Sequence, residues 1–316
     1  MRLIFFISFL LLLQSCGGGD GSSRQDNNKP GELKAVVVPG MDLYGWYSED
    51  YSTENNDLAE LVSYTNTMLA STIEQAKLAV DADFPNVIYR YEHYQITDRM
   101  ETIPVDPDEF RNSYFLAYQQ FLWELKDALV AQGIYDQVDY FFILDEPALR
   151  RDVILDQAFL ERYVLEFDQV FPDKYSMIAF SEDPDSTDPK RGAHMSPPST
   201  VDYLIMVPYF WNNDMPCDSA ALRQYLYTDY PNSNLDWGLQ WGKPVIVAGD
   251  AMIRRDEPPR FCYIDEVFAL VSEDERIQGI LWFIYDERWS IAEGRLKGSK
   301  QSPSFVAAVK ALTAEY

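Results

Sequence analysis

The sequence predicts an α/β fold in which parallel strands close into a barrel, a (β/α)8 or TIM barrel with one strand irregular or missing. From about residue 33, short apolar runs alternate with longer amphipathic stretches, which is typical of parallel strands covered by helices on both faces. The folded part, about 280 residues, matches the length of eight β/α units. An open doubly wound sheet is the alternative, but no Gly-rich phosphate loop follows any predicted strand.

Seven strands are expected from short apolar or strand-like runs, the first of which is stopped by Pro39 and Gly40. In chain order they are residues 34–40, 86–94, 138–147, 174–182, 201–211, 243–252 and 279–289. A closed barrel needs an eighth strand, which we expect either between residues 46 and 57 or shortly before residue 106.

Between these runs the apolar residues recur at helical spacing. The expected helices are residues 57–80, 106–133, 157–171, 217–230, 263–274 and 302–316. The second of them begins with acidic residues, which suit the positive end of the helix dipole, and it ends at Gly133.

The first fifteen residues are interpreted as an export signal that is not part of the fold. Arg2 supplies a short positive region, and residues 3–13 are apolar but too few to span a membrane. The following LQSC resembles a bacterial lipobox, which implies cleavage before Cys16 and a lipid on that cysteine; the alternative is an ordinary signal peptide. Residues 16–32, rich in Gly, Ser and Asn, are a predicted flexible tether, and residues 33–316 a single domain.

A lipid on Cys16 predicts a protein anchored to a membrane. Gly17 directly after the cysteine favours the outer membrane, facing either the periplasm or the cell surface. An exported protein sits in an oxidising compartment, so Cys217 and Cys262 form either a disulfide or two buried free thiols.

The chain is strongly acidic, with 51 Asp and Glu against 26 Lys and Arg and a formal net charge of −25. This balance disfavours nucleic acid and polyanionic glycans as partners, because both need clustered positive charge. Neutral and cationic ligands remain compatible with it. No metal or cofactor is expected, because the two histidines, His93 and His194, lie far apart with no ligand spacing around them.

Acids and aromatic residues gather at the carboxyl ends of the predicted strands, where the active sites of such barrels lie. Aromatic rings stack on the C–H faces of sugars, and carboxylates accept hydrogen bonds from sugar hydroxyls. The candidate catalytic residues are Asp145, Glu146 and Asp250, and the candidate substrate contacts are Tyr44, Trp46, Glu92, Tyr209, Trp211, Trp282 and Asp286. The structural alternatives are a capping role for the acids and core packing for Trp282.

The strand YFFILDEP is similar to the acid/base strand of glycoside hydrolases of the large clan with (β/α)8 barrels, which ends in Asn-Glu and often Pro. The runs at 201–211, 243–252 and 279–289 look like the sixth, seventh and eighth strands of that clan. The resemblance implies that Glu146 is the general acid/base. Two departures are Asp145 in place of Asn and Asp250 as the only acid where the clan has its nucleophilic Glu.

A second resemblance accommodates both departures. Barrel β-N-acetylhexosaminidases that use substrate assistance carry an adjacent Asp-Glu pair, in some followed by Pro, as in Asp145-Glu146-Pro147. The resemblance implies that Asp145 orients the substrate's acetamido group, whose oxygen acts as the nucleophile, while Glu146 is the acid.

The sequence therefore predicts a glycoside hydrolase for neutral or N-acetylated glycans. The alternative function is a surface lipoprotein that binds carbohydrate without hydrolysing it, which the missing seventh-strand Glu favours.

Overall fold

The structure, a computed structural model, describes the part of the chain that forms the barrel. The described residues are 41–46, 57–91, 107–147, 156–180, 196–207, 218–227, 234–250, 253–254, 262–283, 296–297 and 303–313. Lys34–Tyr316 form one compact unit. None of the helices within the described ranges is both long and apolar enough to cross a membrane.

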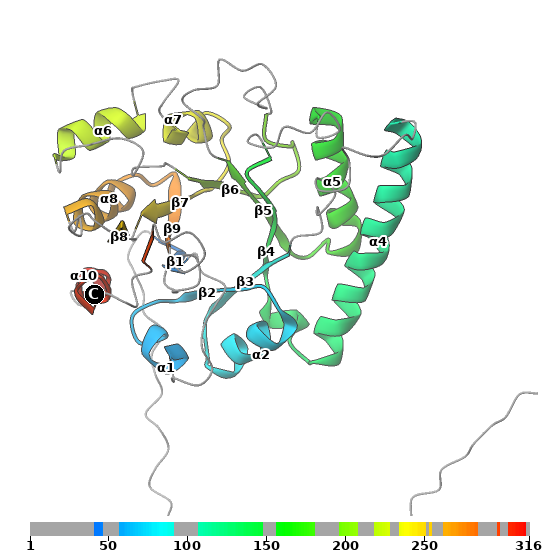
Figure 1. The fold of residues 1–316 in the computed structure, drawn as a ribbon, viewed down its shortest axis with the longest axis horizontal. Helices are drawn as coiled ribbons and strands as arrows, with labels where there is room; N and C mark the ends of the chain where they lie inside the picture. Colours follow the sequence, from blue (N-terminus) through cyan, green and yellow to red (C-terminus); the bar gives the residue numbers. More distant parts are fainter. Residues whose placement is uncertain are drawn as a thin grey trace, which may run out of the picture. The chain divides into compact units, whose positions relative to one another are not determined.

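Eight parallel strands close into a barrel, which confirms the predicted fold class. Each strand is hydrogen-bonded to its two neighbours in sequence order, and the last closes on the first. The strands are β1 (Leu43–Trp46), β2 (Thr67–Ala70), β3 (Asn86–Arg90), β4 (Tyr140–Asp145), β5 (Tyr175–Phe180), β6 (Tyr203–Met206), β7 (Val245–Asp250) and β9 (Ile277–Phe283). Figure 1 shows the helices arranged around this barrel.

The eighth strand is β2, and it lies inside the stretch predicted to be one helix, residues 57–80. That stretch is two short helices, α1 (Asp57–Leu61) and α2 (Ile73–Asp81), on either side of β2. The Asn66 side chain accepts from the backbone N–H of Tyr44 at 2.7 Å and so ties the start of β2 to β1. All four β2 residues are buried. Burial on both faces of a parallel strand therefore overrides the helical spacing.

The first strand is also shifted from its predicted place. The predicted run at residues 34–40 lies outside the described residues, and the first barrel strand is β1, which begins at Leu43. Residues expected to lie in the loop beyond this strand, Tyr44 and Trp46, are therefore part of the strand itself.

The remaining helices agree with the prediction to within a few residues at most ends. They are α4 (Pro107–Ala131), α5 (Gln157–Val170), α6 (Ser219–Tyr227), α8 (Cys262–Glu273) and α10 (Pro303–Thr313), with the unpredicted short helices η2 (Tyr135–Gln137) and α7 (Asn234–Leu239). The predicted glycine stop of α4 is present, since Gly133 has φ of +68°, a conformation that glycine adopts without a steric cost.

Alternate strand residues form two separate apolar clusters. One lines the barrel interior and includes Leu43, Ile88, Phe142, Ala179 and Ala248. The other packs between the barrel and its helices and contains the residues that alternate with these along the strands. The side chain that follows an inward residue thus points outward, as the pleat of a strand requires.

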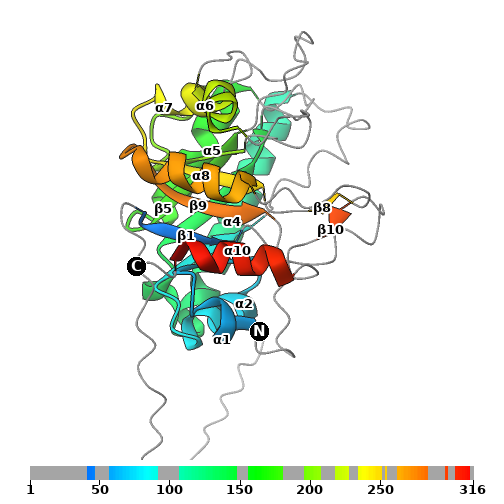
Figure 2. The same ribbon diagram turned by 90° about the vertical axis from the view of Figure 1, so that its left-hand side faces the viewer.

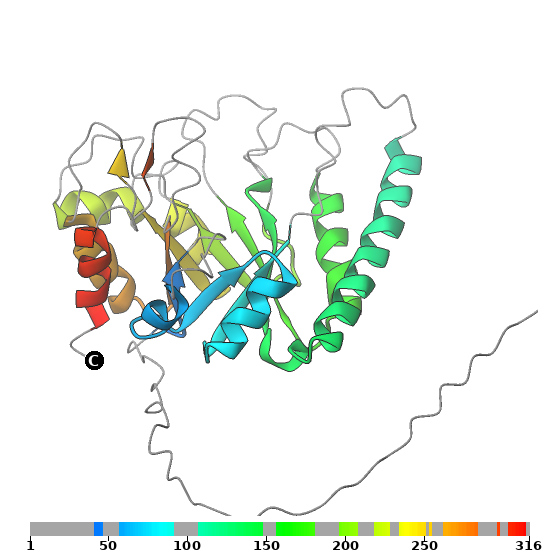
Figure 3. The same cartoon turned by 60° about the horizontal axis from the view of Figure 1, so that its bottom comes forward.

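A small antiparallel sheet stands apart from the barrel. It pairs β8 (Ile253–Arg254) with β10 (Leu296–Lys297). Figure 2 shows it beyond the tip of the β9 arrow, and Figure 3 shows it on the side toward which the barrel strands point. The carboxyl ends of the strands, where barrel enzymes place their sites, face this side.

Candidate active site

The candidate acid pair lies at the carboxyl end of the fourth barrel strand. Asp145 is the last residue of β4, and Glu146 follows it directly. The register between β4 and β5 shifts between Phe142 and Leu144, so that Ile143 is an extra residue, a β-bulge. Before the bulge the inward Phe142 pairs with Met177; after it Asp145 pairs with the inward Ala179.

The bulge decides which acid faces the barrel interior. Without it, strict alternation from Phe142 would point residue 144 inward and Asp145 outward. The inserted residue reverses this alternation, so Asp145 takes an inward position opposite Ala179. Bulges occur next to active sites for this reason, because they aim a side chain without changing the rest of the strand.

Glu146 has a backbone conformation that is costly for its residue type. Its φ is +46°, in the left-handed region, and among the described residues only one other non-glycine residue, Asp83, has a positive φ. The Glu146 N–H is held by the carbonyl oxygen of Ala179 at 3.0 Å, and its side chain is half-buried. Such conformations cost about 1–3 kcal/mol and concentrate at functional sites.

The pair formed by Asp145 and Glu146 has a cationic neighbour, Arg90, that was not predicted from the sequence. Arg90, the last residue of β3, places its Nη2 atom 3.0 Å from Oδ2 of Asp145. The two side chains are only 13% and 21% exposed, and the guanidinium lies 5.3 Å from the centre of the Phe142 ring. The sequence contained the signal, since Arg90 lies two residues after the inward Ile88 and so shares its face.

The ion pair gives the Asp145 carboxyl group a cationic neighbour. A neighbouring guanidinium favours the ionised form of a carboxyl group, so Asp145 is suited to accept hydrogen bonds rather than to give up a proton. Glu146 lies two residues after the buried Leu144 and directly before the buried Pro147.

Three aromatic residues predicted to contact substrate lie elsewhere, which corrects that prediction. Tyr44, Trp46 and Trp282 are at most 1% exposed and belong to the layer between the barrel and its helices. The Tyr44 hydroxyl donates to the carbonyl oxygen of Val309 on α10 at 3.1 Å, and burial raises the pKa of Tyr44. Trp282 packs so closely on Gly249 that a Cβ there would lie 2.7 Å from the indole.

The remaining candidate catalytic residue, Asp250, ends a strand of the barrel. Asp250 ends β7 in register with Phe283, two positions after the inward Ala248, which places it at the carboxyl end of the seventh barrel strand. The positions outside the described residues are Cys16, Glu92, Tyr209, Trp211, Cys217 and Asp286. Cys262 begins α8, and its pairing with Cys217 stays an open alternative.

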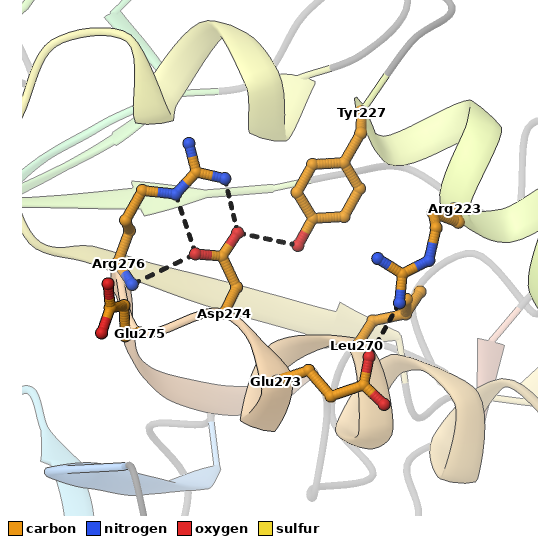
Figure 4. A pocket seen from close by; sticks show the side chains of 7 residues that line it. All are labelled: Arg223, Tyr227, Leu270, Glu273, Asp274, Glu275 and Arg276. Carbon is orange, nitrogen blue, oxygen red and sulfur yellow. Dashed lines mark hydrogen bonds and ion pairs between the residues drawn. The ribbon is translucent and has the colours of Figure 1, made fainter.

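A pocket lined mainly by charged residues lies far from the acid pair Asp145 and Glu146. It has a volume of about 430 Å³ and lies between α6 and α8, beside the amino end of β9 (Figure 4). There Asp274 accepts from the Nη2 atom of Arg276 at 2.6 Å and from the Tyr227 hydroxyl at 3.3 Å. This is an ion-paired surface hollow at the end of the barrel opposite to the strand carboxyl ends.

Within the described ranges, no three His, Cys, Asp or Glu side chains come together in a group that could hold a metal ion.

Comparisons with known proteins agree with the fold. No family model matches the sequence, and no curated protein matches it. A psychrophilic glycoside hydrolase family 10 endo-β-1,4-xylanase is 13% identical, with a TM-score of 0.56 over 85% of this chain and 96% of its own. A xylanase from Paenibacillus barcinonensis is 11% identical, with a TM-score of 0.53 over 80% and 88%.

A β-D-glucuronidase from Dictyoglomus thermophilum is also similar, at 13% identity and a TM-score of 0.56 over 86% of this chain and 50% of that one. The solved structures named here are thus glycoside hydrolases of related architecture. At this level of identity the likeness shows the barrel fold that the strand pairing also shows.

Proposed function

We propose that this chain is a glycoside hydrolase for neutral or N-acetylated glycans, with Glu146 as its general acid/base. The observation that carries the proposal is the acid pair at the carboxyl end of the fourth strand, where a bulge turns Asp145 inward and Glu146 takes a left-handed conformation. The named neighbours, two xylanases and a glucuronidase, support the reaction class.

Hydrolysis of a glycoside requires one carboxyl group that protonates the leaving oxygen and a second group that assists at the anomeric carbon. Glu146 fills the first role in this proposal. For an N-acetylated sugar, the anionic Asp145, fixed by Arg90, accepts a hydrogen bond from the acetamido N–H. The acetamido oxygen then attacks the anomeric carbon, the glycosidic bond breaks, and the Glu146 proton moves to the leaving oxygen.

For a neutral glycan the second group has to come from the protein. Asp250 is the acid at the end of the seventh barrel strand and is the candidate for it. The separation of the two carboxyl groups distinguishes the mechanisms, since about 5 Å suits a nucleophile and about 6.5–9.5 Å suits a base that activates water.

A carbohydrate-binding protein without catalysis is the second candidate. It is favoured by the seventh strand, which ends in Asp250 where the resembling glycosidases carry a glutamate. Binding of glycans by the wild-type protein with no product formed would support this alternative over the hydrolase.

The experiment incubates the wild-type protein with xylo-, gluco-, N-acetylgluco- and N-acetylgalacto-oligosaccharides and follows reducing ends. The variant Glu146→Gln should lose about 10²–10⁴-fold in kcat, the usual contribution of general acid catalysis. Glu124→Gln, an exposed glutamate on α4, is the matched control and should keep wild-type activity. Undiminished hydrolysis by Glu146→Gln would refute the assignment.

The variant Asp145→Asn separates the two mechanisms. If substrate assistance operates, this variant should lose hydrolysis of N-acetylated glycans, and thiazoline inhibitors that mimic the cyclised acetamido group should bind the wild-type protein. Equal activity of Asp145→Asn and wild type on N-acetylated glycans would rule out the assisted route.

We also propose that the protein is an exported lipoprotein anchored through Cys16, with the outer membrane as its place. The support is the export signal with its lipobox-like LQSC ending. The variant Cys16→Ser should move the protein from the membrane fraction to the soluble fraction of its cell; unchanged membrane association would contradict the anchor.

A further inference from the structure

A cluster of four buried tyrosines packs against the outer side of β3 and β4, opposite the acid pair. The tyrosine cluster consists of Tyr91, directly after β3, Tyr114 and Tyr118 on α4, and Tyr163 on α5, each at most 7% exposed. The layer between barrel and helices is mostly apolar, and phenylalanine would fill the same space. A hydroxyl in such a place is costly unless it is hydrogen-bonded.

One of these hydroxyl groups contacts the bulge itself. The Tyr163 hydroxyl donates to the carbonyl oxygen of Ile143 at 3.2 Å, and Ile143 is the extra residue that reverses the alternation of β4. A bulge disrupts the ladder locally, so a side chain that bonds its carbonyl group fixes the backbone where the ladder is weakest. Three residues later along the chain is Glu146.

The other tyrosines hold Tyr163 and the neighbouring strand. The Tyr163 ring stacks on Tyr118 with ring centres 4.1 Å apart, and the Tyr118 hydroxyl lies 2.7 Å from that of Tyr91. Tyr91 directly follows Arg90, and its backbone N–H donates to the carbonyl oxygen of Phe142 at 3.3 Å. The cluster therefore holds the ends of both strands that supply the Arg90–Asp145 ion pair.

Tyr91 and Tyr118 remain neutral at ordinary pH. Burial raises the pKa of Tyr91 and of Tyr118 well above the usual value near 10, because the phenolate would lose its hydration. Neutral hydroxyl groups keep their protons and can serve as fixed hydrogen-bond donors throughout the range in which a glycosidase works.

We propose that Tyr163 is a positioning residue for Glu146, acting through the Ile143 carbonyl and supported by Tyr118 and Tyr91. The inference rests on the proposed function, since Glu146 has to be the acid for its position to matter to the rate. Loss of the Tyr163 hydroxyl leaves the ring packing in place but frees the bulge. A misplacement on the order of 1 Å at a catalytic group can lower a rate about 10²-fold.

The kinetic test compares Tyr163→Phe with wild type on two aryl glycosides of the sugar that the oligosaccharide panel identifies. Phenyl glycosides need protonation of the leaving oxygen, whereas 2,4-dinitrophenyl glycosides do not. We expect kcat of Tyr163→Phe to fall about tenfold on the phenyl glycoside and less than about threefold on the dinitrophenyl one, with KM unchanged. A merely structural role would lower both rates equally.

Tyr44→Phe is the matched control, because Tyr44 is equally buried and also donates to a backbone carbonyl, that of Val309 at 3.1 Å. It lies in the packing layer beside β1 and α10, three strands away from β4. The change in kcat caused by Tyr44→Phe should be the same on the phenyl and the dinitrophenyl glycoside. Tyr91→Phe, which removes the hydroxyl contact with Tyr118, serves as a second variant and should show the same pattern as Tyr163→Phe in weaker form.

A hydrogen-exchange measurement separates failure of this inference from failure of the proposed function. In Tyr163→Phe, the peptide spanning residues 140–147 should exchange about five- to tenfold faster than in wild type, the equivalent of one lost hydrogen bond of about 1 kcal/mol. In Tyr44→Phe it should exchange at the wild-type rate. If the peptide exchanges faster in Tyr163→Phe while the wild-type protein hydrolyses none of the panel, the contact between Tyr163 and the bulge is retained and the proposed enzymatic function is refuted.

Two results would overturn the inference. One is unchanged exchange of the 140–147 peptide in Tyr163→Phe. The other is an equal loss of kcat on both aryl glycosides in a protein whose wild type is active.

Discussion

The left-handed conformation of Glu146 predicts that glycine is more stable than alanine at this position. Both Glu146→Ala and Glu146→Gly remove the carboxyl group, so the two variants differ only in the Cβ atom. A Cβ in the left-handed region costs about 1–2 kcal/mol, and glycine costs about 0.5–1 kcal/mol in unfolded-chain entropy. With φ of +46°, the net advantage of glycine is about 0.5–1 kcal/mol.

Thermal unfolding followed by circular dichroism measures this difference. For a domain of this size about 1 kcal/mol shifts Tm by about 2–4 °C, so the glycine variant should melt about 1–4 °C above the alanine variant. Both should lack activity if Glu146 is the acid.

Glycine and alanine variants at two other positions serve as controls. At Asp83, whose φ is +61°, glycine should again be more stable than alanine. At Asp127, an exposed position inside α4, the order should reverse, because glycine costs about 1 kcal/mol in a helix. An alanine variant of Glu146 as stable as the glycine variant, with the expected orders at Asp83 and Asp127, would refute the strain argument.

Two further predictions concern charge. Arg90→Met should lower the free energy of unfolding by about 2–3 kcal/mol, which is less than for a fully buried ion pair because Asp145 is 21% exposed. Urea unfolding of Arg90→Met, Asp145→Asn and the double variant should give a coupling energy of about 1–2 kcal/mol between the two residues. Additive effects of the two substitutions would contradict the ion pair. Burial, aided by the charge of Asp202, raises the pKa of Asp168 to about 6. Ionisation of Asp168 above that pH therefore lowers the stability of the folded protein. Below about pH 4 the carboxyl group is protonated in both the folded and the unfolded protein, and this loss of stability disappears. Asp168→Asn should therefore raise the free energy of unfolding at pH 8 by about 1 kcal/mol, a value that allows for solvent screening of a half-buried group. At pH 4 the same unfolding assay should show no increase in stability.

The barrel was predictable because parallel strands buried on both faces leave a strong signal. The runs that became β4, β5 and β7 are apolar on consecutive residues, which water-exposed strands avoid. The strand β2 was not predictable in this way, because it is only four residues long and lies between two helices. Its apolar residues continue the helical spacing, and its pairing with β1 and β3 shows it to be a strand.

The positions of the candidate residues were predicted in part, and the errors at Tyr44 and Trp46 have one physical origin. Asp145 and Glu146 lie at the strand end as expected, whereas Tyr44 and Trp46 were assigned to a loop that is in fact β1. A shift of a few residues in a strand boundary changes a side chain from the mouth of the barrel to its outer layer. The bulge at Ile143 was equally invisible, because it depends on the register with β5 and not on the residue itself.

The leaving-group dependence of Glu146→Gln tests the central claim most directly. The measurement compares kcat of the wild type and of the variant on phenyl and 2,4-dinitrophenyl glycosides of one sugar. If Glu146 protonates the leaving oxygen, the variant should lose at least about 10²-fold on the phenyl glycoside and far less on cleavage of the dinitrophenyl bond. An equal ratio of variant to wild-type rate on both substrates would contradict the account.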